Sequence, residues 1–425
     1  MRNFIFITLF IFMTSTPTFS MASDNASEKN QDIMLGAYLL EDAYNPEKII
    51  EFESDIEQEL AIINIFTSFD YDWNQLHVQC SNIVNEGATP MITLEPTLAD
   101  RPNDNLLPEI SQGHWDDYID EWIANFMLWM KDRDDPNARV LLRFAHEFNG
   151  IWYPWSNDPN AYITAWQYLH NKFEVAGANQ YIEWVWNANN IDIDDYNDIT
   201  QYYPGDDMVD WTSLDGYNWG ANYSFTEWST FTELFEEQYA VLTTSFPHKP
   251  ILIAEIATVE PSDLPNTADE YAGNDSDSHE SKAKWIKDMF KQIRLNFTHI
   301  KGVIWFNTNK EFSWSLNEAD HNTGLDKFRK MAQKKYITSD FNTVAFYDME
   351  ESDPIASMAP IAKLSDNTDN TDNTDNSLLN SSHKMKNQAD GFRALSKSVI
   401  EKRRQQHHEM IAKQMVQDKK DKKEK

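Results

Sequence analysis

Eight short runs of apolar or β-branched residues recur along the chain, with longer amphipathic stretches between them. The runs are Ile33–Leu40, Ala61–Phe69, Pro90–Leu94, Val140–Ala145, Ile182–Asn187, Ser213–Asn218, Pro250–Ile256 and Gly302–Asn307. Helical spacing is clearest at Trp115–Lys131, Ala161–Ala176, Phe231–Thr243, Ser281–Leu295 and Leu325–Lys334. Repeated strand–helix units of this kind form a parallel sheet covered by helices. Eight of them over about 340 residues predict an α/β fold, a (β/α)8 TIM barrel with long strand-to-helix loops.

A doubly wound parallel sheet is the competing fold. Such sheets bind dinucleotides through a glycine-rich loop after the first strand. The whole chain has only 12 glycines, and no such loop follows the first apolar run. The barrel is therefore favoured, and it predicts that the chemistry lies where the strands end and the next loops begin.

The two ends of the chain differ from this pattern. Residues 1–22 have the charge, the apolar run and the small residues of a cleavable export signal, which predicts a secreted or periplasmic protein. The catalytic domain is expected at 23–364, followed by an Asp/Asn/Thr-rich linker at 365–376. The tail, 377–425, has 13 Lys and Arg against 6 Asp and Glu. It is expected to be partly helical or disordered, and either dispensable or a contact to an anionic surface.

Charge and cysteine content narrow the function classes. The formal net charge is −33, with 69 acidic residues against 36 basic ones, so the acidic body is not expected to bind nucleic acid. Cys80 is the only cysteine, which excludes an intramolecular disulfide and a cysteine-rich zinc site. The pair His146-Glu147 lacks the second histidine of a zinc protease helix, since Gly150 stands there. The oligomeric state is left open.

Two glutamates stand at strand ends on opposite sides of the expected barrel. Glu147 follows the fourth apolar run, and Glu255 lies within the seventh. Glycoside hydrolysis needs two carboxyl groups, one to protonate the leaving oxygen and one to attack or to activate water. We therefore predict that Glu147 and Glu255 are catalytic. The alternative for Glu255 is a structural ion pair with an arginine such as Arg143.

Aromatic and amide side chains gather at the same strand ends. Indole and phenol rings stack on the apolar faces of sugars, and amides hydrogen-bond to hydroxyl groups. Singly, each tryptophan is more often a core residue, but together they favour a carbohydrate groove. The predicted substrate-binding residues are His146, Asn149, Trp152, Trp155, Asn187, Tyr217, Trp219 and Trp305.

The segment from Arg143 to Trp155, with His146-Glu147-Phe148-Asn149-Gly150 followed by Trp152, resembles the acid/base segment of glycoside hydrolase family 26. The resemblance continues through Trp184–Asn187, Asp215–Trp219, Ile253–Glu255 and Val303–Asn307. It implies a retaining barrel glycosidase with no cofactor and no metal. It also implies Glu147 as general acid/base, supported by His146, and Glu255 as nucleophile, hydrogen-bonded by Tyr217, with Trp152 lining the sugar site.

The resemblance also implies a substrate class. Endo-β-1,4-mannanases dominate the family, so a β-1,4-mannan-type polysaccharide, or its oligosaccharides, is the first expectation. Mixed-linkage β-glucan or β-1,3-xylan is the alternative within the family. A catalytically inactive carbohydrate-binding protein is the alternative from another class. Such a protein would keep the aromatic residues and lose the glutamate pair, and both glutamates are present.

Overall fold

The computed structural model describes residues 32–39, 44–133, 135, 137–192, 197–221, 226–260, 280–310, 312–317 and 323–345. The expected export signal at 1–22, the linker at 365–376 and the basic tail at 377–425 lie outside these residues. The description that follows concerns the barrel.

Eight parallel strands close into a barrel, as the sequence predicts. They are β1 (Ile33–Tyr38), β2 (Ile62–Ser68), β3 (Thr89–Glu95), β4 (Val140–Phe144), β5 (Ile182–Asn189), β6 (Trp211–Asn218), β7 (Ile251–Thr258) and β8 (Ile300–Phe306). Each strand pairs with the next along the chain, and β1 pairs with both β2 and β8, which completes the ring. A two-residue strand, β9 (Ile337–Thr338), is added alongside β1.

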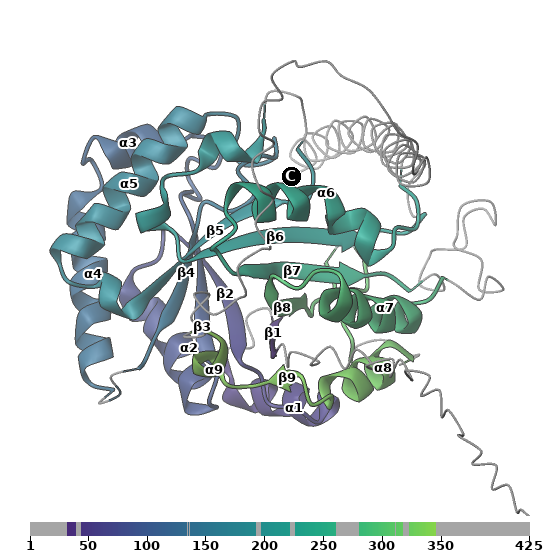
Figure 1. Ribbon diagram of the computed structural model, residues 1–425. Coiled ribbons are helices and arrows are strands. Elements are labelled where there is room, and N and C mark those ends of the chain that lie inside the picture. The colour runs from purple at the N-terminus through teal and green to yellow at the C-terminus, as the bar shows by residue number, and fades with distance from the viewer. Residues whose placement is uncertain are drawn as a thin grey trace, which may run out of the picture. The chain divides into compact units, whose positions relative to one another are not determined.

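The helices form an outer layer around the strands (Figure 1). They are α1 (Pro46–Ile56), α2 (Trp73–Asn85), α3 (Leu107–Ser111), α4 (Asp116–Lys131), α5 (Pro159–Val175), α6 (Phe231–Ser245), α7 (Lys282–Leu295) and α8 (Thr323–Ala332). The short helix α9 (Phe341–Ala345) instead packs against one end of the barrel interior. The five helices that the sequence predicts are found with ends within two residues of their expected positions. No helix in the described ranges has both the length and the apolar character that crossing a membrane requires.

Two helices that the periodicity did not reveal owe their starts to side-chain caps. Asn45 accepts a hydrogen bond from the backbone of Glu47 at the start of α1, where Pro46 follows directly. Asp72 and Gln75 form a reciprocal capping box at the start of α2. Such caps satisfy backbone N–H groups that have no partner within the helix.

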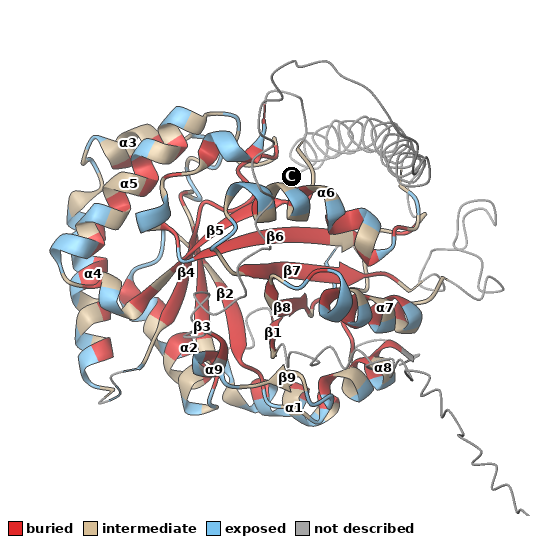
Figure 2. Cartoon of the chain, in the orientation of Figure 1, coloured by how far each residue is buried: buried red, intermediate tan, exposed pale blue. Residues whose placement is uncertain are grey.

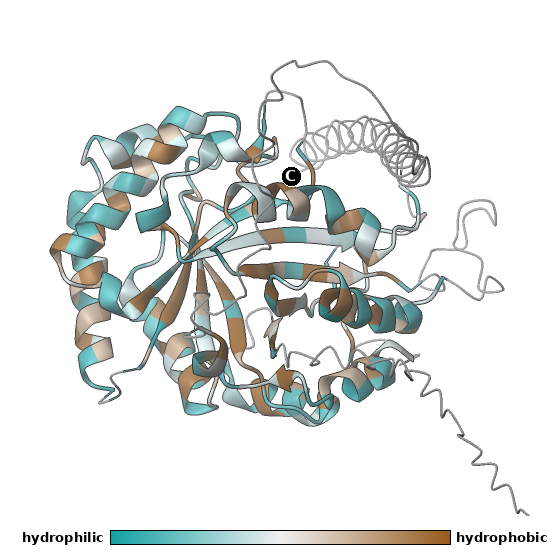
Figure 3. Cartoon of the chain, in the orientation of Figure 1, coloured by the Kyte–Doolittle hydropathy of each residue, from teal (hydrophilic) through white to brown (hydrophobic). Residues whose placement is uncertain are grey.

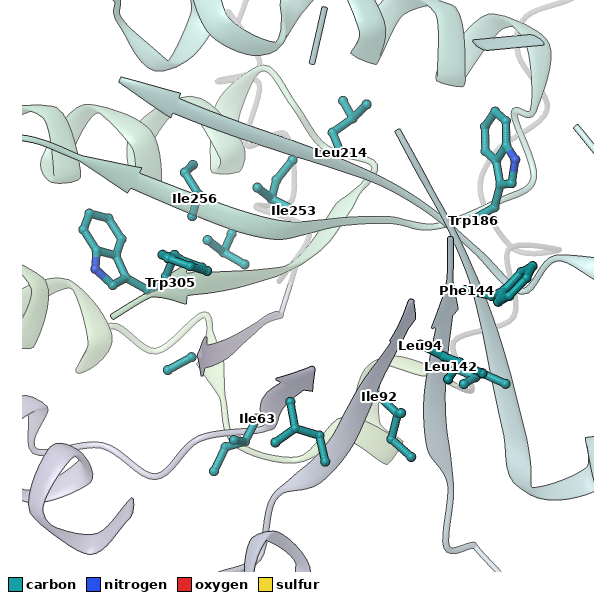
Figure 4. Packing of buried hydrophobic residues seen from close by; sticks show 14 of the residues in the cluster. Ile63, Ile92, Leu94, Leu142, Phe144, Trp186, Leu214, Ile253, Ile256 and Trp305 are labelled. Atoms are coloured by element: carbon teal, nitrogen blue, oxygen red, sulfur yellow. The ribbon is translucent and has the colours of Figure 1, made fainter. Parts of the chain in front are cut away.

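The main apolar core lies between the strands and the helices. The strands are almost wholly buried, and the helices are buried only on the face toward them (Figure 2). The helices likewise have both hydrophobic and hydrophilic residues along their length (Figure 3). Outward side chains such as Ile92, Leu142, Trp186 and Trp305 fill this layer (Figure 4). Alternate residues of each strand are therefore left to fill the inside of the barrel.

A second, smaller apolar cluster fills the amino-terminal end of the barrel interior. Its members are Met34, Ala61, Ile62, Met91, Leu141, Val185, Trp211, Leu252, Ala254, Ile304, Phe341 and Val344. The last two come from α9, and the ring of Phe341 lies 6.1 Å from that of Trp211. This end is thus packed with apolar side chains, and the polar residues of the interior lie toward the carboxyl ends of the strands.

Candidate active site

A buried arginine joins four strands inside the barrel. From β4, the Nε of Arg143 donates to Thr93 of β3 at 2.8 Å. One terminal nitrogen donates to Asp215 of β6 at 2.9 Å, and the other to Glu255 of β7 at 2.6 Å. The guanidinium is fully buried, and its hydrogen bonds to Thr93, Asp215 and Glu255 replace its contacts with water.

Glu255 reaches the interior because β7 carries one extra residue. Leu214 and Asp215 are consecutive in β6, yet their partners in β7 are Ile253 and Glu255. A register shift is also present between β7 and β8 across this stretch. Ala254, the unpaired residue, belongs to the cluster inside the barrel, and the bulge lets Glu255 turn inward as well. Bulges of this kind often re-aim a side chain beside an active site.

The second oxygen of Glu255 is held from the neighbouring strand. The hydroxyl of Tyr217, near the end of β6, donates to this oxygen at 2.5 Å. Burial and the charge of Glu255 raise the pKa of Tyr217 well above its usual range, so the phenol keeps its proton. The two oxygens of Glu255 therefore receive one bond from a guanidinium and one from a phenol.

Glu147 follows β4 in an unusual backbone conformation. Ala145 and Glu147 have φ values of 47° and 51°, which side-chain-bearing residues seldom adopt. Backbone bonds hold both in place, from Ala145 N–H to Leu94 and from Glu147 N–H to Asn187, each at 3.1 Å. Strained residues persist where their surroundings fix them, and they cluster at functional sites.

Two side chains hold the carboxyl group of Glu147. Its Oε2 accepts from the indole of Trp152 at 2.7 Å, and its Oε1 accepts from the amide of Asn189 at 2.7 Å. Gly150 allows the first contact, since a Cβ there would lie 2.6 Å from the Trp152 ring. Burial and the negative charge of Glu255 raise the pKa of Glu147 to about 7. Glu147 can thus carry a proton near neutral pH.

His146 lies behind Glu147 as a neutral imidazole. Burial, together with the charge of Arg143, lowers the pKa of His146 well below its usual range. Its Nε2 lies 2.8 Å from the hydroxyl of Tyr153, whose ring stacks on that of Trp155 at 4.3 Å. The indole of Trp155 donates to the backbone carbonyl of His146 at 2.8 Å. Trp155 is fully buried, so it supports this segment from within.

The predicted aromatic residues divide into two groups. Trp152, Tyr217 and Trp219 are partly exposed at the carboxyl ends of the strands, beside the glutamates. Trp219 packs edge-on against Trp314, with ring centroids 5.3 Å apart. Trp305 is fully buried and faces outward, its ring 5.5 Å from that of Phe328 in α8. Like Trp155, Trp305 presents no ring surface to a ligand.

The two predicted asparagines are buried supports. Asn149 donates to the backbone carbonyl of Asn189 at 3.0 Å and accepts from its N–H at 2.7 Å. Asn187 donates to Ser213 and Asp215, each at 2.9 Å. The amide that reaches Glu147 is that of Asn189, which the sequence analysis did not select. The expected fifth strand ended at Asn187, but β5 continues to Asn189, and these two residues face the same side.

The alternative interpretation of Glu255 as an ion-pair partner of Arg143 is correct about the contact. Asp215 and Glu255 nevertheless differ in setting. Asp215 is 0% exposed and is held by Arg143 and Asn187 within the barrel, whereas Glu255 is 6% exposed near the partly exposed Tyr217 and Trp219. Asp215 thus contacts the arginine deep in the interior, whereas Glu255 contacts it nearer the open end of the barrel.

This arrangement has the parts of a carbohydrate-cleaving site. A protonatable carboxyl group and a carboxylate held by cationic and phenolic donors lie together at the carboxyl ends of the strands, with partly exposed aromatic rings around them. Within the described ranges, no group of three or more His, Cys, Asp or Glu side chains is placed to hold a metal ion. A carboxyl pair at the carboxyl ends of the strands of a (β/α)8 barrel is the arrangement that barrel glycoside hydrolases use.

Comparison with known proteins shows a similarity to one family. Residues 105–301 match the model of Glycosyl hydrolase family 26. Endoglucanase H of Acetivibrio thermocellus is 30% identical over 270 residues, which are 62% of this chain and 26% of that protein. Mannan endo-1,4-beta-mannosidase A and B of Caldalkalibacillus mannanilyticus is 30% identical over 114 residues, which are 24% of this chain and 20% of that protein.

A solved structure shows the same fold. The catalytic domain of an endo-beta-1,4-mannanase from Bacillus sp. JAMB-750 superposes with a TM-score of 0.56 at 17% identity, covering 75% of this chain and 90% of that domain. The curated relatives are much longer than the matched region, since this chain spans about a quarter or less of their length.

Replacing the buried arginine should weaken the fold strongly. Arg143→Met leaves Asp215 and Glu255 without their cation, and we expect the free energy of unfolding to fall by about 3–5 kcal/mol. Urea denaturation measures this value. Arg101→Met is the matched control, because Arg101 pairs with Glu109 at a partly exposed position and its loss should cost at most about 1 kcal/mol. Equal losses in the two variants would show that the interior network does not hold the barrel.

Proposed function

We propose that this domain is a retaining endo-β-glycosidase that cleaves a polysaccharide by double displacement. Glu147 acts as general acid/base and Glu255 as nucleophile. The observation that carries this assignment is the difference between their surroundings. Burial and a neighbouring negative charge raise the pKa of Glu147 to about 7, so that it can carry a proton, while Glu255 is held by hydrogen bonds from the Arg143 guanidinium and the Tyr217 hydroxyl.

In the first step, the Glu255 carboxylate attacks the anomeric carbon while Glu147 gives its proton to the departing oxygen. The product is an ester between the sugar and Glu255, and the negative charge of Glu255 is lost. Since that charge is one cause of the high pKa of Glu147, the pKa falls at this stage. Glu147 can then remove a proton from the water that hydrolyses the ester, which restores both groups.

The substrate that we propose is a β-1,4-linked glucan or mannan. The match to Endoglucanase H extends over 270 residues, against 114 for the mannan endo-1,4-beta-mannosidase, and this favours a β-glucan, including the mixed-linkage kind. The motifs of the acid/base segment favour mannan as the second candidate. Trp152, Tyr217 and Trp219 are the partly exposed rings that we propose contact the sugar.

Hydrolysis of a polymer panel tests the function. We expect reducing sugar to be released from mixed-linkage β-glucan, glucomannan or galactomannan. The panel also includes β-1,3-xylan, the less favoured alternative. Glu255→Ala should abolish turnover on every substrate. Glu147→Ala should lower turnover on polymers strongly and retain part of it on aryl glycosides, because a good leaving group does not need protonation. Folded protein that releases nothing from the panel but binds it would favour the inactive carbohydrate-binding alternative.

The pH profile tests the role of Glu147. Because the acid must be protonated, kcat/KM should fall as the pH rises through about 7. The Trp152 indole donates to the Glu147 carboxyl group and so lowers its pKa. Trp152→Phe removes this donor and should move the descending limb to higher pH. Trp129→Phe removes a comparable indole bond, to Ser81 at 2.9 Å on the helical surface, and should leave the limb unmoved. A limb that is unchanged in Trp152→Phe would argue against Glu147 as the acid.

Export and the role of the tail are also proposals. We propose that residues 1–22 direct the protein out of the cytoplasm and are removed, and that the basic tail, 377–425, contacts an anionic surface. Sequencing the amino terminus of the protein recovered outside the cytoplasm tests the first point, and a start at Met1 would contradict it. Binding of the full chain to anionic vesicles should weaken with salt and be lost when the tail is removed.

A further inference from the structure

A third carboxyl group, that of Glu95, lies at the same end of the barrel as the two glutamates. Glu95 is the last residue of β3, in which Met91 and Thr93 also face the interior. Its Oε1 lies 4.0 Å from Nε2 of His146, the residue directly before Glu147. The side chain of Glu95 is 25% exposed, against 8% for the side chain of Glu255.

The carboxylate of Glu95 has no hydrogen-bond donor among the described residues. The separation from His146 is too long for a hydrogen bond, and the imidazole is neutral, so it supplies no compensating charge. The backbone carbonyl of Glu95, and not its carboxylate, accepts a hydrogen bond from the N–H of Thr97 at 2.8 Å. The other carboxylates of the site each accept two or more donors from the protein.

Charges at the open end of the barrel act on Glu95. Burial and the negative charge of Glu255 raise the pKa of Glu95 to about 7, although Arg143 and Lys310 oppose the shift. A partly desolvated carboxylate with two unused acceptor oxygens is costly in the free protein. It gains the most from a ligand that brings hydroxyl donors to it.

We propose that Glu95 binds the substrate directly, by accepting hydrogen bonds from hydroxyl groups of the sugar ring that lies next to Glu255. This inference rests on the proposed glycosidase function and adds a specificity residue to it. Two carboxylate oxygens can receive two neighbouring hydroxyl groups of one ring, so the contact depends on how those hydroxyls are oriented. Glucose and mannose units differ in the orientation of one hydroxyl, so this contact can help to discriminate between them.

Glu95→Ala tests the contact. On the best polymer of the panel we expect KM to rise about 10-fold or more, because a charge-assisted hydrogen bond is lost, while kcat changes little. The dissociation constant of a matching oligosaccharide, measured in the Glu147→Ala background, should rise by a similar factor when Glu95→Ala is added. Glu95→Gln keeps one acceptor oxygen, so its KM and dissociation constant should lie between those of the unaltered protein and those of Glu95→Ala. The ratio of activities on glucan and mannan should change in both variants.

Glu183→Gln is the matched control. Glu183 is also partly buried, and burial raises its pKa to about 7, but it stands near the start of β5, at the opposite end of the barrel. Its replacement should leave KM and the glucan-to-mannan ratio unchanged. Thermal unfolding of each variant separates a change of binding from a change of fold.

The outcomes separate the two proposals. If the unaltered protein is active and Glu95→Ala lowers stability with KM, oligosaccharide affinity and substrate ratio unchanged, then Glu95 is a structural residue and the inference is wrong, while the glycosidase function stands. If the unaltered protein neither cleaves nor binds any polymer, the proposed function fails, and the role of Glu95 fails with it.

Discussion

The structure depends on one cation placed where water cannot reach it. The guanidinium of Arg143 is wholly inside the barrel and contacts side chains from three other strands. A buried charge is tolerated only when its partners are close and correctly oriented, so these strands are held in a fixed relation to one another. The fixed relation in turn places Glu255 at the open end with one oxygen bound and the other within reach of Tyr217.

The same cation explains how two glutamates in one small volume acquire different properties. Glu255 is bound directly to the arginine, whereas Glu147 receives only neutral donors, from Trp152 and Asn189. Glu147 also feels the charge of Glu255 across the site. The difference between the two carboxyl groups thus follows from which of them contacts Arg143, and it requires no difference in residue type.

The sequence predicted the barrel because strand periodicity is local, and eight runs in succession admit few folds. It also selected Glu147, Glu255, Trp152 and Tyr217, which the structure brings together. It did not separate exposed from buried aromatic residues, since Trp155 and Trp305 carry the same local pattern as Trp152. Asn189 was not selected because the fifth strand was predicted to end at Asn187, two residues before its actual end. Glu95 could have been found by continuing the alternation of β3 by one residue. The bulge in β7 could not have been predicted in this way, because it depends on how neighbouring strands pair.

The extra residue in β7 means that the direction of the Glu255 side chain depends on the number of residues in that strand. Strand residues alternate between two faces, so deleting Ala254 would remove the register shift between β6 and β7 without altering any side chain of the site. In that shortened strand, Glu255 would take the interior place that Ala254 now fills, deeper in the barrel and farther from the open end. Deleting this one residue would therefore leave the residues that form the barrel in place and move only the Glu255 carboxyl group away from its open end.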